Sequence, residues 1–148
     1  MLDAEMNQRY WQSLSNRYYT REQWTKIFLA AMASGTVASW GFWSQYELIW
    51  KILSSISALV AIALPILNWS KMIESMGYLT EKWTRIKNDY ELLWIDVKNG
   101  IKDENKIKKE LKRIKNEENN LSQKETNLPN DQKLLLVCSE NVLKSRGL

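Results

Sequence analysis

The apolar positions of this chain are gathered in two neighbouring runs. No charged residue occurs in residues 27–46 or 52–70, and Glu47 and Lys51 are the only charged residues between these runs. A helix of about 20 apolar residues is long enough to cross the hydrocarbon of a bilayer. The pattern therefore predicts a two-helix transmembrane hairpin over residues 24–69, with helices at 24–43 and 48–69. A buried hairpin in a soluble protein is the alternative, although soluble core helices rarely go so long without a polar face.

Aromatic and basic residues at the ends of these runs predict the same boundaries and an orientation. Tryptophan and tyrosine favour membrane–water interfaces, and lysine and arginine collect on the cytoplasmic side. Basic residues precede the first run and follow the second, whereas Lys51 is alone between them. Both termini are therefore expected in the cytoplasm. The expected interface anchors are Trp24 and Trp69 on the inner side, and Trp40, Trp43, Tyr46 and Trp50 on the outer side.

Small and hydroxyl-bearing residues recur at helical spacing within both runs. Such residues let helix backbones approach closely in lipid, where apolar burial no longer drives association. They either pack the two helices of one chain together or face other copies and line a pore. The candidate residues are Ala31, Ser34, Gly35, Ser39, Ser54, Ser57, Ala58, Ala61 and Asn68.

The segment before the hairpin, residues 1–23, predicts an amphipathic helix on the cytoplasmic side. Met6, Tyr10, Leu14 and Tyr18 recur every four residues, and Trp11 lies beside them. An aromatic face next to arginines suits a helix lying in the headgroup layer. Packing against the cytoplasmic helices of the same chain or of another copy fits the pattern equally well.

Residues 70–148 predict a cytoplasmic helical bundle or coiled-coil region with helices at 70–99, 103–126 and 132–144. In the first of these, apolar residues alternate steps of three and four, which is typical of a coiled-coil or bundle seam. The second continues the phase less well, because Glu104, Glu118 and Glu125 occupy seam positions. The seam begins at Met76. Its candidate oligomer or bundle contacts are Leu79, Trp83, Ile86, Tyr90, Leu93 and Val97.

Composition argues against catalysis. The chain has no histidine and one cysteine, Cys138, so the usual zinc sites and histidine-dependent hydrolysis are excluded. No glycine-rich phosphate loop is present, and no pair of carboxylates is marked out for acid–base chemistry. Basic residues at 102–115 are interspersed with acids and lack aromatic neighbours, which disfavours nucleic acid as a direct ligand. We therefore expect neither an enzyme nor a metal or cofactor site. Cys138 is expected to be a buried packing residue and not a nucleophile.

The order of these parts resembles the SLATT family of bacterial two-transmembrane proteins. The resemblance covers roughly residues 5–121 and rests on this architecture and on the segments "NRYYTREQW" (16–24) and "WTRIKNDYELLW" (83–94). It implies an anti-phage or conflict-system effector at the bacterial inner membrane, which breaches that membrane when triggered. It also implies an operon partner, either a nucleotide-synthesising enzyme with its signal product or a reverse transcriptase complex. A nucleotide second messenger is thus a candidate trigger.

Three functions fit these observations. The first is a homo-oligomeric defence effector that permeabilises the bilayer and causes abortive infection through cell death or arrest. The second is a phage holin, although the long patterned region after residue 70 exceeds what that role needs. The third is a two-span anchor or scaffold that recruits a soluble partner through the seam.

Overall fold

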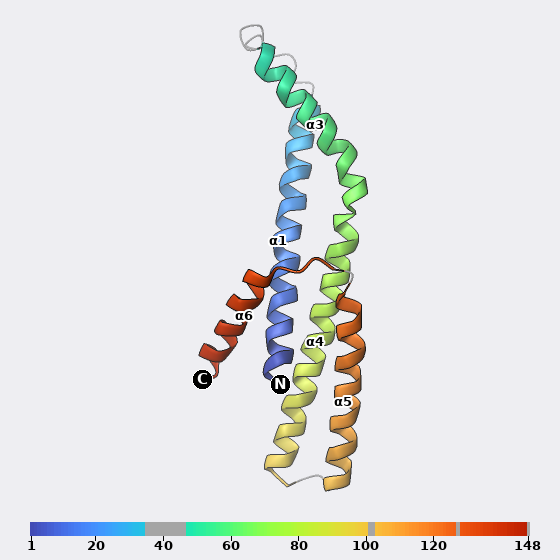
Figure 1. Ribbon diagram of the computed structural model, residues 1–148, viewed down its shortest axis with the longest axis vertical. Helices are drawn as coiled ribbons and strands as arrows, with labels where there is room; N and C mark the ends of the chain where they lie inside the picture. Colours follow the sequence, from blue (N-terminus) through green and yellow to red (C-terminus); the bar gives the residue numbers. More distant parts are fainter. Residues whose placement is uncertain (35–46, 101–102, 127, 148) are drawn as a thin grey trace. The chain divides into compact units, whose positions relative to one another are not determined.

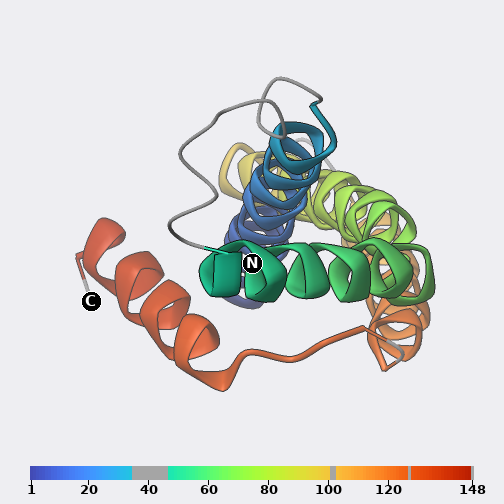
Figure 2. The ribbon, with the colours of Figure 1, turned by 90° about the horizontal axis from the view of Figure 1, so that it is seen from above.

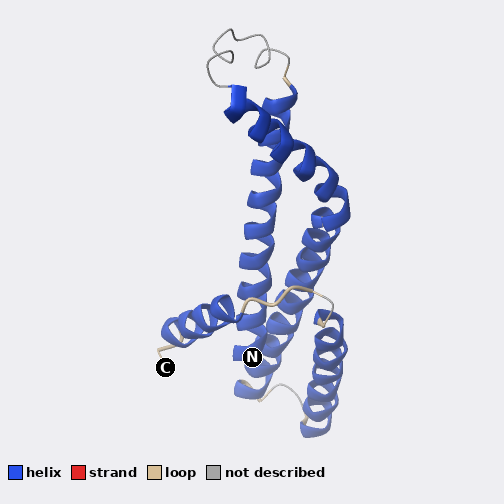
Figure 3. Cartoon of the chain, turned by 45° about the horizontal axis from the view of Figure 1, so that its top comes forward, coloured by secondary structure: helices blue, strands red, loops and turns tan. Residues whose placement is uncertain are grey.

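The computed structural model describes residues 1–34, 47–100, 103–126 and 128–147, and within these ranges the chain is all-α (Figure 3). The described part contains five helices and no strand. Their bounds are α1 Leu2–Ala33, α3 Glu47–Leu67, α4 Trp69–Lys98, α5 Glu104–Glu125 and α6 Gln132–Ser145. The all-helical class expected from the sequence is therefore confirmed for the described residues.

Turn and capping residues set the helix boundaries. Asn68 separates α3 from α4 with a left-handed backbone, at φ 50°, and its carbonyl accepts the first amide hydrogen bonds of α4. Gly100, at φ 62°, follows α4 where the sequence predicted a stop. The side chains of Asp103 and Asp131 accept backbone N–H bonds at the starts of α5 and α6. The break near the end of α3 thus occurs at Asn68, whereas Pro65 stays inside the helix.

The chain divides into two compact units. The bundle unit consists of Met1–Ser15 together with Glu74–Leu148, and the apolar-helix unit is Asn16–Ile73. Because α1 runs without interruption from Leu2 to Ala33, the expected boundary between an amphipathic helix and a first span, at residue 23, is not a helix break. Residues 35–46, which include the end of the expected first span and the turn of the hairpin, lie outside the described residues.

The core of the bundle unit is built on the seam of α4. Hydrogen bonds between Tyr90 and Glu118 and between Trp83 and Glu125 join α4 to α5. The two helices run antiparallel (Figure 1). The view from above in Figure 2 shows the long connection that leads from α5 to α6. The buried apolar side chains of this core are Ala4, Tyr10, Trp11 and Leu14 of α1, Met76, Leu79, Trp83, Ile86 and Leu93 of α4, Ile114 and Leu121 of α5, and Leu134, Cys138 and Val142 of α6.

The seam of α4 is covered to different extents along its length in the described chain. Val97 is 43 % exposed, and Tyr90 is only half-buried, so the buried seam ends at Leu93. Val97 lies in the last turn of α4, which ends at Lys98, and this position leaves it less covered. The buried part of the seam is also covered by helices of this same chain. It therefore forms an internal core and does not present a free surface for a second copy.

Candidate functional site: an exposed apolar helix and its polar anchors

Most of the apolar surface of helix α3 is uncovered by the described part of the chain. Its half-covered positions, such as Ser57 and Val60, recur on one side, whereas large aliphatic side chains project on the others. Eight of these side chains are between 47 % and 76 % exposed. They are Leu48, Ile49, Ile52, Ile56, Leu59, Ile62, Ile66 and Leu67.

The free energy of this exposure is large. The eight side chains expose as much surface as about five fully exposed ones, and burying one aliphatic side chain is worth about 1.5–3 kcal/mol. Covering them would therefore contribute about 7–14 kcal/mol, which matches the whole stability of a typical domain, about 5–15 kcal/mol. Contiguous apolar patches of this kind mark membrane or protein contact surfaces. The exposed side of α3 is thus a candidate surface for contact with lipid or with another protein.

Taken singly, none of the helices in the described ranges has the length and apolar content needed to cross a bilayer. The bent pair Lys51–Leu67 and Trp69–Lys98, joined at Asn68, does satisfy the requirement together, by length and composition only.

The structure places the predicted small-residue positions on different sides of the helices. Ser54 and Ser57 lie on the half-covered side of α3, whereas Ala58 and Ala61 are exposed. Asn68 is also exposed, at the junction with α4, as is Ala31 in α1, and Ser34 is half-exposed just after the end of α1. Gly35 and Ser39 lie outside the described residues. The described small residues of α3 thus lie on two sides of the helix, the serines on the half-covered side and the alanines on the exposed side.

The predicted interface anchors are described only at the inner end. Trp24 is 68 % exposed and Trp69 is half-exposed. Trp40, Trp43 and Tyr46 lie outside the described residues, as does the side chain of Trp50. Indole side chains, with an apolar ring and a polar N–H, are enriched at protein and membrane interfaces.

A polar contact joins α1 to the start of α4 within the apolar-helix unit. Glu22 is 6 % exposed, and its Oε1 lies 2.8 Å from Lys26 Nζ and accepts a 2.7 Å hydrogen bond from Ser70 Oγ. The hydrogen bonds from Lys26 and Ser70 lower the pKa of the Glu22 carboxyl, although burial opposes them. The sequence signal for this contact is a Glu–Lys pair four residues apart before the first apolar run and a serine at the end of the second. Sequence reasoning missed it, because nothing in the spacing shows that the two ends meet.

A second carboxylate, Glu125, connects three helices of the bundle unit. Its Oε1 accepts hydrogen bonds from Trp83 Nε1 at 2.6 Å and from Trp11 Nε1 at 2.9 Å. Glu118 accepts a hydrogen bond from the Tyr90 hydroxyl at 2.9 Å in the same way. Burial and this hydrogen bond raise the pKa of Tyr90 to about 12. Glu118 and Glu125, which interrupt the apolar seam pattern of α5, therefore accept the hydrogen bonds of the tyrosine hydroxyl and the indole N–H groups.

Comparison of the chain with protein-family models, curated proteins and solved structures finds no match to any of them.

Proposed function

We propose that this chain is a bacterial inner-membrane effector that oligomerises and permeabilises the membrane when it is triggered, causing abortive infection. The observation that carries the proposal is the uncovered apolar surface of α3, whose burial is worth about as much as the folding of a domain. The likeness to the SLATT family in segments 16–24 and 83–94 supports the defence role. That likeness also supports a trigger made by an operon-encoded nucleotide-synthesising enzyme or a reverse transcriptase complex.

The topology in this proposal is a two-span hairpin with both termini in the cytoplasm. Basic residues flank its two inner ends, and the contact of Glu22 with Lys26 and Ser70 lies where the first apolar run begins and the second ends. Trp24 and Trp69 then occupy the inner interface. The 20 residues from Trp24 to Trp43 would span about 30 Å as a helix, which is close to the hydrocarbon thickness.

Permeabilisation requires several copies, because two helices are too few to enclose a channel. The seam of α4 is already used within the bundle unit, so it is not available for assembly. Association would instead use the outward-facing small residues of α3, Ala58 and Ala61, which permit close helix contact in lipid. The hydroxyl-bearing Ser54 and Ser57 lie on the half-covered side.

Arginines placed on the exposed face of α3 test the proposal. We expect Leu59→Arg with Ile62→Arg to reduce membrane insertion, since each arginine near a span centre costs about 2.5–3.5 kcal/mol. Leu136→Arg is the matched control, because Leu136 is an equally exposed leucine in the bundle unit, at 64 %. The readouts are recovery in the membrane fraction and a membrane-potential dye in phage-challenged cells. Polarised membranes and normal growth in challenged wild-type cells would contradict the effector role.

A scaffold is the second candidate, and exposed apolar residues on α4 favour it. Leu92, Trp94 and Ile95 are 61 %, 65 % and 49 % exposed, so the bundle unit offers a surface for a soluble partner. Replacing residues 24–69 with an unrelated two-span anchor separates the two functions. Protection that survives the exchange assigns the activity to the bundle unit, whereas protection lost with normal membrane targeting assigns it to the hairpin.

A further inference from the structure

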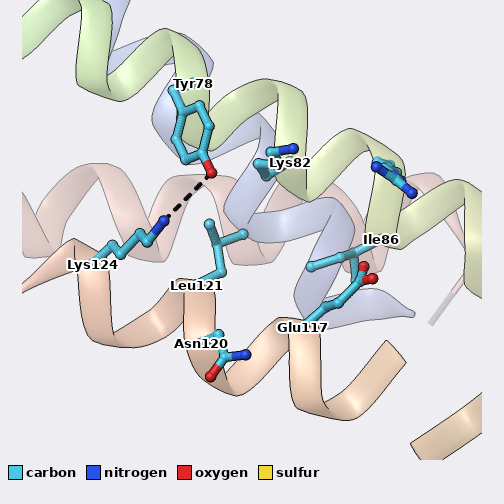
Figure 4. Close-up of a pocket in the computed structure, with 8 residues that line it drawn as sticks. Tyr78, Lys82, Ile86, Glu117, Asn120, Leu121 and Lys124 are labelled. Atoms are coloured by element: carbon cyan, nitrogen blue, oxygen red, sulfur yellow. Dashed lines mark hydrogen bonds between the residues drawn. The ribbon is translucent and has the colours of Figure 1, made fainter. Parts of the chain in front are cut away.

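Three cationic side chains line one pocket in the bundle unit, and two of them lie near the ring of Tyr78. Tyr78, Lys82 and Arg85 of α4 line a pocket of about 190 Å³ with Lys124 of α5. Figure 4 shows Tyr78 and Lys82 on α4, and Lys124 reaching the tyrosine hydroxyl from α5. Lys82 Nζ lies 5.4 Å and Lys124 Nζ 5.2 Å from the centre of the Tyr78 ring, and Lys124 Nζ also donates a long hydrogen bond of 3.5 Å to the Tyr78 hydroxyl.

The positive charge of this pocket is not balanced within the described part of the chain. No described carboxylate lies within 4 Å of Lys82, Arg85 or Lys124. The one acid that lines the pocket, Glu117, is engaged by Arg113, whose Nη1 lies 3.0 Å from Glu117 Oε1. Like charges gathered in one pocket repel each other, which leaves an unfavourable electrostatic energy. An anion between the cations would remove it.

The shape and chemistry of the pocket define the class of anion. Ile86 and Leu121 supply apolar surface between the two helices (Figure 4), and Asn120 is a further polar residue of the lining. An arginine and two lysines together suit the several oxygens of a phosphate. The volume is below the roughly 300–1,000 Å³ of sites that enclose a drug-sized ligand. The pocket therefore has room for a phosphoryl group and a small part of its substituent, while the rest projects into solvent.

We propose that this pocket binds a phosphate ester, bridging α4 and α5. Lys82, Arg85 and Lys124 contact the phosphate oxygens, and the Tyr78 ring packs against the substituent. The same chemistry is offered by a soluble nucleotide and by an anionic phospholipid headgroup. The pocket lies wholly within the bundle unit, so this proposal does not depend on the hairpin forming a pore.

Binding to the full-length chain in a mild detergent tests the proposal. Adenosine 5′-monophosphate and inorganic pyrophosphate serve as soluble probes in calorimetry, and nanodiscs of phosphatidylglycerol or phosphatidylcholine serve as lipid probes. Lys82→Gln with Lys124→Gln removes two charges from the pocket. Lys112→Gln with Lys115→Gln is the matched control, because it removes two charges from exposed positions on α5. Arg85→Gln is a second pocket variant, at an exposed position whose replacement leaves the core intact.

We expect the pocket variants to bind at least tenfold more weakly than both the wild type and the matched control, and raised salt to weaken wild-type binding. Loss confined to the soluble probes identifies a nucleotide-type ligand. Loss confined to phosphatidylglycerol, measured against phosphatidylcholine, identifies a headgroup. Equal binding by the wild type and both pocket variants, or no binding of any probe by the wild type, would overturn the proposal.

Discussion

A single replacement at Glu125 should loosen three helices of the bundle unit at once. Its Oε1 is the shared acceptor for the indole N–H groups of Trp11 in α1 and Trp83 in α4. Both indoles are buried, with 4 % and 1 % of their surface exposed, so water cannot easily replace the carboxylate. Glu125→Ala therefore leaves two buried donors without an acceptor.

The size of the effect follows from the two donors. A buried polar group left without its partner costs about 1–3 kcal/mol, so Glu125→Ala should lower the free energy of unfolding by about 2–6 kcal/mol. Glu125→Gln keeps a carbonyl acceptor but loses the charge, and a neutral hydrogen bond is weaker than a charged one. We expect that variant to lose about 1–3 kcal/mol.

Denaturant unfolding of the full-length chain in mild detergent, followed by tryptophan fluorescence, measures these losses. Glu104→Ala is the matched control, because Glu104 is also an acid of α5 but pairs with Lys108 on the exposed surface, at 77 % and 70 % side-chain exposure. Exposed pairs contribute about 0–1 kcal/mol. A Glu125→Ala variant within about 0.5 kcal/mol of wild type, or a control that loses as much, would refute the reasoning.

Replacements at three further positions test other parts of the fold. Burial raises the pKa of Glu5, but hydrogen bonds and charge contacts with arginines such as Arg146 outweigh burial and lower the pKa overall. The stability that this carboxylate contributes is present above its ordinary pKa and is lost as pH falls. Glu5→Gln should therefore reduce the loss of folding free energy at acidic pH in a stability–pH curve. Burial and the Glu118 hydrogen bond raise the pKa of Tyr90 to about 12. The folding free energy contributed by the neutral phenol should therefore decrease between about pH 10, its ordinary pKa, and about pH 12. Tyr90→Phe should remove this decrease, and tyrosinate absorbance is the readout. Asn68 has φ 50°; Asn68→Ala should cost about 1–2 kcal/mol in thermal or denaturant unfolding, whereas Asn68→Gly should be neutral or stabilising.

The periodic core of the bundle unit was predictable from local spacing. Residues at heptad spacing lie on one face of a helix, so they are expected to be buried together. The structure buries Leu79, Trp83, Ile86 and Leu93. The acids of α5 were visible in the same phase, but their partners were not. A glutamate at a seam position looks unfavourable until a tryptophan or tyrosine on the facing helix is known to donate to it. That information lies in the pairing of helices, which the spacing within one helix does not contain.

The placement of the first helix shows the same limit. Tyr10 and Trp11 form an aromatic face that suits a membrane interface as well as a protein core. The structure places them in the core through long-range contacts. The Tyr10 hydroxyl donates to Asn130 Oδ1 at 3.2 Å and accepts the Asp131 N–H at 2.9 Å, and Trp11 donates to Glu125. These partners lie more than 110 residues away in sequence, so no local pattern could choose between the two environments.

The heptad of α4 and the apolar run of α3 differ in what their hydrophobicity implies for assembly. Both patterns predict that the apolar side chains are buried, but neither pattern identifies the surface against which they pack. In α4 the cover is internal, since Trp83 and Leu79 are buried by helices of the same chain. In α3 the described chain provides little, and Leu59 and Ile66 stay 69 % and 76 % exposed. A second copy that docked on the seam would have to unfold the bundle unit, whereas one that docked on α3 would cover surface that is already open. Assembly through α3 is therefore the less costly route.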